Sequence, residues 1–146
     1  MDTKLPAGQS KHASTRVWLE GGILYVKFVG EFSIEGILDV ERQCLEVIQR
    51  NGIKLIPFIV DVGDVDDGAM QLHITEIGKI FSSIDVVKHF SMILLVGAKS
   101  NVRKIVSVIN KTFLGGRMQY AETVNEAQST IRNSKDSPGP ILEQDI

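Results

Sequence analysis

A strand, a loop and a helix are predicted within residues 55–81, and this unit constrains the fold more than any other part of the chain. Its first part, LIPFIVDV, is an apolar run too continuous to alternate between core and solvent, which is typical of a parallel strand covered on both faces. The run reaches Asp61, crosses an acidic loop and enters an amphipathic segment. Because open α/β sheets place their sites at the carboxyl ends of such strands, we expect the functional surface in this loop.

Strand-like and helix-like patterns alternate along the rest of the chain. Gly21-Gly22 joins two β-rich runs, and such a dipeptide supplies the positive φ angles of a two-residue hairpin. Ser33 stands where a helix N-cap is expected, and TVNE from Thr123 forms a capping box. The predicted strands cover 16–20, 23–30, 55–61, 89–96 and 118–120, and the predicted helices follow Ser33, the acidic loop, Ser100 or Asn101, and Thr123. This order, β-β-α-β-α-β-α-β-α, predicts an α/β fold with a mixed sheet and right-handed crossovers.

A single domain between two tails is predicted. The 146 residues are enough for one self-sufficient core, and 43% apolar with 23% charged residues exclude a fibrous or wholly disordered chain. The first residues are polar and without periodicity, and SKDSPGPILEQDI at the other end has the composition of a flexible segment. We therefore expect a domain at 15–133, a flexible N-terminal tail at 1–14 and a flexible C-terminal tail at 134–146.

Charge, hydropathy and cysteine content disfavour several classes of function. A net charge of −2 lacks the basic excess of a general nucleic-acid binder. No run approaches the roughly 18 apolar residues of a membrane span, and the first residues hold no apolar core like that of a signal peptide, so we expect no stable membrane insertion and a cytoplasmic location. Cys44 is the only cysteine, which excludes an intramolecular disulfide, and its place on an apolar helical stripe predicts a small buried hydrophobe.

The acidic loop carries aspartates at positions 61, 64, 66 and 67. An EF-hand calcium loop is excluded, because counting back from Gly68 places Gly63 and Val65 at ligand positions and Ile74 where the bidentate Glu belongs. Clustered carboxylates also suit Mg²⁺, but GAKSN after the fourth strand lacks the phosphate-binding GxxxxGK[ST] pattern. Turn formation and helix capping are favoured for these aspartates. No catalytic residue, metal ligand or cofactor is predicted.

Three pieces of the chain resemble one known family. They are GILYVKFVGEF at Gly22–Phe32, the strand FIVDV with Asp61 at its end, and TVNEA at Thr123–Ala127. Their order and spacing are similar to those of the STAS domain, the fold of bacterial anti-sigma-factor antagonists of the SpoIIAA type, and of the uncharacterised SpoIIAA-like proteins. The resemblance implies a non-enzymatic module that binds a partner protein, often switched by phosphorylation of a Ser or Thr at the start of the helix after the Asp-ended strand.

The switch residue of that family has no counterpart here. Where the antagonists carry Asp-Ser-Ser-Gly, this chain reads Asp66-Asp67-Gly68, and no Ser or Thr occurs between Asp61 and Ile74. A carboxylate at a helix N-terminus is electrostatically favoured, so Asp67 is able to imitate a permanently phosphorylated state, with less charge and fewer acceptors than phosphate. The residues of the predicted partner-binding surface are Asp64, Asp66, Asp67, Gly68 and Met70.

A second charged surface is predicted on the third helix, where Arg103, Ser107 and Lys111 fall one turn apart. Such a face suits an acidic protein, a phosphorylated ligand or an anionic membrane surface, although a solvated helix face is the simpler interpretation. The residues of this possible anion- or partner-binding face are Lys99, Arg103, Lys104 and Lys111. Its charge is opposite to that of the acidic loop, which suits self-association as a homodimer or a charged partner.

Three functions are consistent with these patterns. The favoured one is a STAS-like regulatory module in bacterial signalling whose partner is an anti-sigma-factor-like or other signalling protein. The second is a carrier of a small apolar or lipid-like ligand, which the resemblance allows because related folds hold such molecules. The third, ranked last, is an Asp-dependent metal enzyme built on Asp61 and Asp64.

Overall fold

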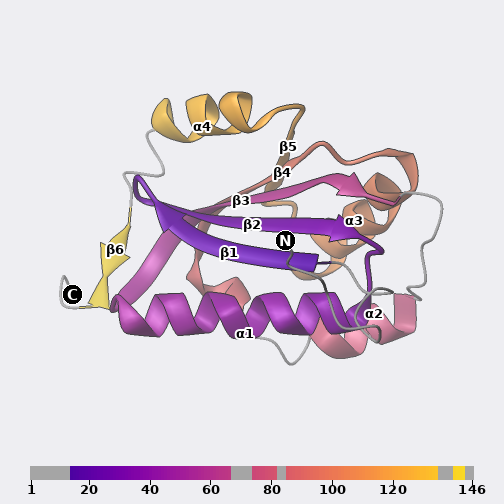
Figure 1. The fold of residues 1–146 in the computed structure, drawn as a ribbon, viewed down its shortest axis with the longest axis horizontal. Helices are drawn as coiled ribbons and strands as arrows, with labels where there is room; N and C mark the ends of the chain where they lie inside the picture. Colours follow the sequence, from indigo (N-terminus) through magenta and orange to yellow (C-terminus); the bar gives the residue numbers. More distant parts are fainter. Residues whose placement is uncertain (1–13, 67–73, 82–84, 135–139, 144–146) are drawn as a thin grey trace, which may run out of the picture.

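The computed structural model describes residues 14–66, 74–81, 85–134 and 140–143. Its main elements alternate between strands and helices, with a short 3-10 helix, η2, before β4 (Figure 1). They are β1 (Ser14–Glu20), β2 (Ile23–Gly30), α1 (Ile34–Arg50), β3 (Ile53–Val65), α2 (Ile74–Phe81), η2 (Val86–His89), β4 (Phe90–Val96), α3 (Ser100–Phe113), β5 (Met118–Ala121), α4 (Val124–Arg132) and β6 (Ile141–Leu142). The predicted α/β class and the order of the main elements are confirmed.

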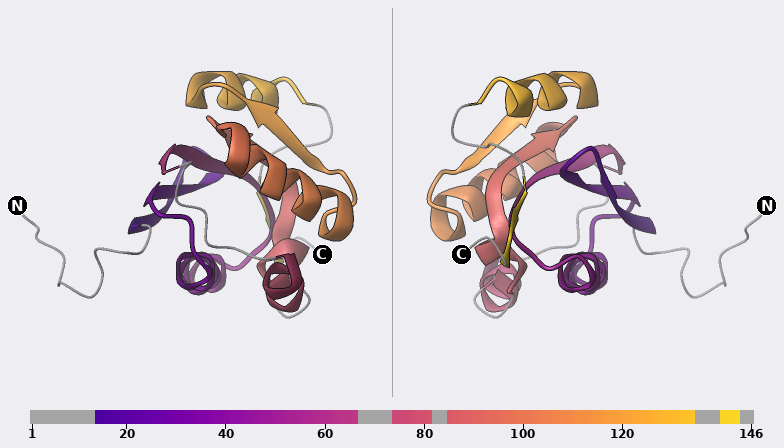
Figure 2. Two further views of the ribbon diagram at one scale, coloured as in Figure 1. Left: turned by 90° about the vertical axis from the view of Figure 1, so that its right-hand side faces the viewer. Right: turned by 90° about the vertical axis from the view of Figure 1, so that its left-hand side faces the viewer.

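The five main strands lie in the order β1-β2-β3-β4-β5. β1 pairs with β2 antiparallel through the Gly21-Gly22 turn, and β2, β3, β4 and β5 run parallel. Both turn glycines have positive φ, 59° and 79°, as the hairpin requires. α1 and α2 lie under the curved sheet and α4 lies on its other face (Figure 2). The mixed sheet is therefore organised around β3, its central strand.

Local signals explain where the helices begin. The Ser33 hydroxyl accepts a hydrogen bond from the Gly36 N–H at 3.1 Å, and the Thr123 hydroxyl accepts one from the Glu126 N–H at 3.1 Å. Each bond satisfies a backbone donor that the first helical turn leaves without an internal partner. Glu126 in turn accepts from the Glu122 N–H at 2.7 Å, so the predicted capping box is present in a slightly shifted form.

β3 is longer than the sequence predicts at its carboxyl end. We expected the strand to end at Asp61, yet β3 continues to Val65, so Asp61 and Asp64 lie in the strand and not in a loop. Backbone pairing with β2 explains the extension, because Val29 faces Asp64 and Gly30 faces Val65. At the other end, Pro57 lies at a shift of register between β3 and β4, the kind of irregularity where a strand tolerates proline.

The C-terminal segment contains one pairing that the sequence did not indicate. Within residues 134–146, predicted as a flexible tail, Ile141–Leu142 form β6 and pair antiparallel with the start of β3. Two residues are too short to give a strand-like pattern, and the neighbouring proline and glycine are typical of a tail. Residues 1–13 and most of 134–146 lie outside the described residues.

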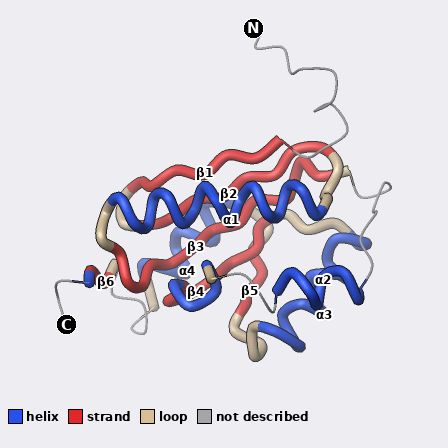
Figure 3. The backbone as a smooth tube through the Cα atoms, turned by 90° about the horizontal axis from the view of Figure 1, so that it is seen from below, coloured by secondary structure: helices blue, strands red, loops and turns tan. Residues whose placement is uncertain are grey.

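Two apolar clusters cover the two faces of the sheet. The larger one lies between the sheet and the helices α1, α2 and α3, whose backbones Figure 3 shows from below. Phe58 of β3 points into this cluster with 1% of its surface exposed. The smaller one lies under α4 and contains Ile59, which is fully buried. Neighbouring residues of β3 thus point into different clusters, which accounts for the unbroken apolar run in the sequence.

We expect Phe58→Ala to lower the free energy of unfolding by roughly 3–5 kcal/mol, because it removes a buried ring and leaves a cavity. The Phe58 ring packs edge-to-face on Phe90 with 4.5 Å between the ring centroids. Urea denaturation followed by circular dichroism measures the loss. Val29→Ala, at a side chain that is 40% exposed, is the matched control and should cost less than about 0.5 kcal/mol. Equal losses for the two variants would contradict the assignment of this core.

Candidate functional site

Three charged side chains meet at the carboxyl end of β3. The Lys27 Nζ lies 3.0 Å from the Asp64 Oδ2 and 3.4 Å from the Asp61 Oδ2. Lys27 faces Asp61 across the parallel pair, while Val29 faces Asp64, so three residues of β3 span two of β2. An extra residue of this kind turns the following side chains. The bulge thereby brings two carboxylates that are three positions apart to one ammonium group, and we call these three residues the acidic end of β3.

The two carboxylates have different roles. Asp61 also accepts a hydrogen bond from the Gly63 N–H at 2.9 Å, and its side chain is only 21% exposed. Asp64 is 63% exposed, although it makes the shorter contact with Lys27. Asp61 therefore fixes the local backbone, while Asp64 presents an oriented carboxylate to solvent.

Lys27 is electrostatically held in its charged form. The hydrogen bond to Asp64 is the main reason that the pKa of Lys27 lies above its ordinary value, with burial opposing the shift and the charge of Asp61 adding to it. An opposite charge within hydrogen-bond distance favours the ionised state. The cation consequently stays between the two carboxylates throughout the physiological pH range.

The backbone next to the acidic end is closely packed. Gly97, in the loop after β4, has a φ of 73°, and a Cβ added there would lie 2.9 Å from the Cα of Gly63. Only glycine combines this conformation with such a close approach. The end of β3 and the start of the loop into α3 are therefore in direct backbone contact.

The predicted partner-binding surface is described only in part. Asp64 belongs to the acidic end of β3, and Asp66 follows it as an exposed residue whose backbone N–H donates to the Gly30 carbonyl at 2.7 Å. The remaining predicted residues, Asp67, Gly68 and Met70, lie outside the described residues. Lys27 was not predicted as a site residue. Its position on the same face of β2 as Ile23 and Tyr25 was a weak signal, since a lysine there needs a partner.

The predicted basic face lies on the solvent side of α3. Its four residues, Lys99, Arg103, Lys104 and Lys111, are all exposed. The Arg103 guanidinium stacks over the Tyr120 ring, 4.2 Å from its centroid, and the Tyr120 hydroxyl lies 3.1 Å from the Ser107 hydroxyl. Arg103 is thus oriented by a cation–π contact.

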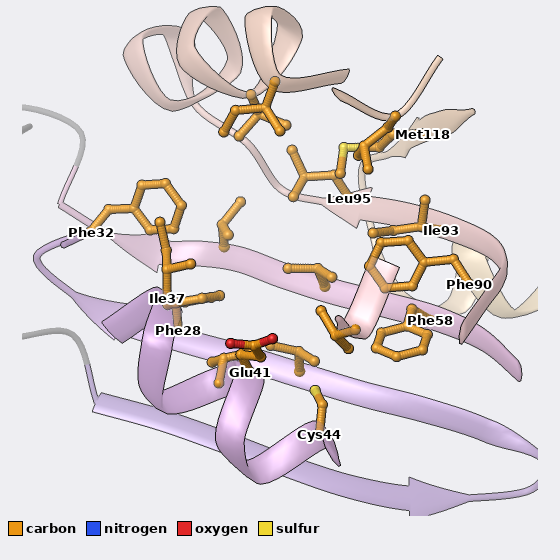
Figure 4. A pocket seen from close by; sticks show the side chains of 18 residues that line it. Phe28, Phe32, Ile37, Glu41, Cys44, Phe58, Phe90, Ile93, Leu95 and Met118 are labelled. Atoms are coloured by element: carbon orange, nitrogen blue, oxygen red, sulfur yellow. The ribbon is translucent and has the colours of Figure 1, made fainter. Parts of the chain in front are cut away.

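An apolar cavity of about 110 Å³ lies between α1, α3 and the sheet (Figure 4). Of the described residues that line it, Glu41 alone carries a charge, and its carboxylate accepts a hydrogen bond from the Asp85 N–H at 2.7 Å. Cys44 also lines the cavity. Burial, followed by the negative charge of Glu41, raises the pKa of Cys44 to about 12, so the thiol stays protonated. The prediction that Cys44 is a buried hydrophobe is confirmed.

Two further properties concern metals and membranes. Within residues 14–66, 74–81, 85–134 and 140–143, no group of three or more His, Cys, Asp or Glu side chains is arranged to hold a metal ion. In the same part of the chain, no helix combines the length and the hydropathy needed to cross a lipid bilayer.

The architecture matches that of three solved structures. An uncharacterized protein of the DUF3478 family with a SpoIIAA-like fold, from Shewanella loihica PV-4, is 16% identical, with 89% of this chain and 98% of that chain covered and a TM-score of 0.57. The unphosphorylated form of the anti-sigma factor antagonist SpoIIAA is 14% identical, with 83% and 98% covered and a TM-score of 0.53. An anti-sigma factor antagonist from Mycobacterium paratuberculosis is 15% identical, with 84% and 97% covered and a TM-score of 0.51.

These likenesses show the fold. No family model matches the chain, and no curated protein sequence does. The chain has the SpoIIAA-like, or STAS-like, fold over most of its length, as the sequence resemblance implied.

We expect Asp61→Ala to destabilise the fold more than Asp64→Ala. The first variant leaves the Gly63 N–H without its acceptor and removes a half-buried ion-pair partner, so the free energy of unfolding should fall by about 1–2 kcal/mol. The second removes an exposed carboxylate and should cost less than about 0.5 kcal/mol. Urea titrations of both variants give the comparison. A greater loss for Asp64→Ala would show that this carboxylate, predicted from the sequence for partner contact, is a structural one.

Proposed function

We propose that this protein is a non-enzymatic regulatory module that binds a partner protein through the acidic end of β3 and the residues that follow it. The contact surface is formed by Asp64 and Asp66, together with Asp67, Gly68 and Met70 from the predicted surface. The observation that carries the proposal is the exposed Asp64 carboxylate, which Lys27 holds at the end of the central strand. Proteins named as anti-sigma factor antagonists share the fold, which supports this class of function.

The acidic end is suited to recognition because it is already ordered. Lys27 fixes the Asp64 side chain, so a partner does not have to restrict its rotation on binding. A carboxylate has about four acceptor positions. Within the described parts of the chain, the contact with Lys27 uses one of these positions, which leaves room for a partner's arginine or lysine. Charged groups of this kind steer a partner toward the surface and fix its orientation.

Regulation must differ from a phosphorylation switch in this loop. Because no Ser or Thr occurs between Asp61 and Ile74, the negative charge of the surface is constant. A constant charge suits a module whose partner binding is controlled by the supply of the partner or by a contact elsewhere on the domain. We place this role in the cytoplasm, with an anti-sigma-factor-like or other signalling protein as the partner.

The test is a charge reversal on the exposed carboxylate. We expect tagged wild-type protein to retain one stoichiometric protein from an extract of the source cells, and Asp64→Lys and Asp67→Lys to lose it. Glu46→Lys is the control, since Glu46 is an exposed acid whose partner, Arg42, lies on its own helix. With the purified partner, titration calorimetry should give a dissociation constant at least tenfold higher for Asp64→Lys, a difference of about 1.4 kcal/mol. Equal retention by all the baits would overturn the proposal.

The apolar cavity supports a second candidate function, the binding of a small apolar ligand. An engineered apolar cavity of about 150 Å³ in another protein stays dry and takes up benzene or xenon. The cavity here is somewhat smaller, at about 110 Å³, so it has room for a molecule of a few carbon atoms. The Glu41 carboxylate at its wall would favour a ligand with one hydrogen-bond donor.

Benzene and xenon are the probes for this cavity. We expect either probe, added at millimolar concentration, to shift the NMR methyl signals of Val106 and Ile93, which line it. Val106→Leu adds a methylene to the wall and should weaken the shifts several-fold, because the remaining volume is small. Val29→Leu, on the exposed side of β2, is the matched control. Unchanged methyl signals in the wild type would exclude the ligand-binding candidate.

A further inference from the structure

β3 has an unusual partner at its amino end. β2 pairs with β3 only from Phe58 onward, so residues 53–57 of β3 extend past the β1–β2 hairpin. β6 pairs with this extension, with Leu142 opposite Ile53 and Ile141 opposite Leu55. Pro140 lies against the turn of the hairpin, where a Cβ added to Gly22 would be 3.2 Å from the proline ring. The C-terminal segment thus lies next to the hairpin turn and pairs with the part of β3 that β2 does not reach (Figure 1).

The contacts of this segment are those of a bound peptide. The Glu143 N–H donates to the Gly52 carbonyl at 2.8 Å, which adds a backbone bond beyond the two paired residues. The Leu142 side chain packs against the larger apolar cluster. Backbone pairing at a strand edge, together with a pocket for one side chain, is the pattern by which proteins bind extended peptides as an added strand.

The segment is held by few contacts compared with the strands of the main sheet. Pro140 and Glu143 are exposed and Ile141 and Leu142 are half-buried, whereas most of β2 is buried. Its pairing covers two residues and includes a register shift. Elements with few buried contacts open more readily than the core does.

We propose that the edge of β3 at residues 53–55 is a binding site for an extended peptide strand, with residues 140–143 as its intramolecular occupant. The partner that fits is a strand with an aliphatic residue in the place of Leu142 and a proline or small residue facing Gly22. A polar residue follows the aliphatic one, with its N–H on the Gly52 carbonyl. This site lies at the opposite end of β3 from the acidic end, so it does not depend on the function proposed above.

Releasing the occupant should make the site available to a peptide in solution. The probe is a fluorescent peptide of residues 138–146, PGPILEQDI, titrated into the full chain and followed by anisotropy. In the full-chain variant Leu142→Asp, a charge replaces the side chain that packs on the core, which expels the segment. A tethered competitor acts at millimolar effective concentration, so we expect the peptide to bind this variant at least tenfold more tightly than the wild type.

A second variant and two controls make the result specific. Glu143→Pro removes the N–H that donates to Gly52 without changing the core, and it should give the same gain in peptide affinity even if Leu142→Asp fails to fold. Leu38→Asp, at an exposed residue of α1, should bind the peptide as weakly as the wild type does. A peptide carrying the Leu142→Asp change should bind to none of these chains.

The bound peptide should also change the NMR signals of the Ile53 and Leu55 amides. The proposal is overturned if folded Glu143→Pro protein binds the peptide no better than the wild type does. It is equally overturned if the peptide binds every variant alike without affecting those two amides.

Discussion

The burial of β3 on both faces is the constraint on which the rest of the structure depends. Phe58 and Ile59 point into different apolar clusters, so helices must cover both sides of the sheet. Such coverage is typical of parallel strands joined by crossover helices, and β2, β4 and β5 run parallel to β3 or to its neighbour in this way. Both of the binding surfaces inferred for this protein lie at the ends of β3, on either side of its covered middle part.

Most of the fold could be predicted from the sequence because its signals are local. Ser33 and Thr123 mark helix starts because their own hydroxyl groups cap the first turn. Gly21-Gly22 indicates a hairpin because glycine readily adopts the positive φ angles of the turn. The length of β3 was not predictable in the same way. Its extension to Val65 depends on a bulge in its pairing with β2. A bulge is defined by how two strands pair, so the sequence of one strand alone does not reveal it.

The position of the candidate site was predictable from the sequence, but not all of its residues were. Asp64 follows from the rule that sites lie at the carboxyl ends of parallel strands. Lys27 comes from the neighbouring strand, so its meeting with Asp61 and Asp64 depends on register. The cavity is less predictable still, since its volume is what remains after side chains from α1, α3 and four strands, β2 to β5, have packed. β6 carries no periodic signal, because two residues cannot show one.

The close approach of Gly63 and Gly97 has a consequence for how the surface is recognised. It places the acidic end of β3 beside the loop that leads to Lys99, so regions of opposite sign border each other at one end of the sheet. A partner that covers this border must carry both signs itself, in a matching arrangement. Added salt would then screen both the attractive and the repulsive charge pairs between the protein and its partner. The choice among partners would depend on how their charges are arranged more than on their net charge.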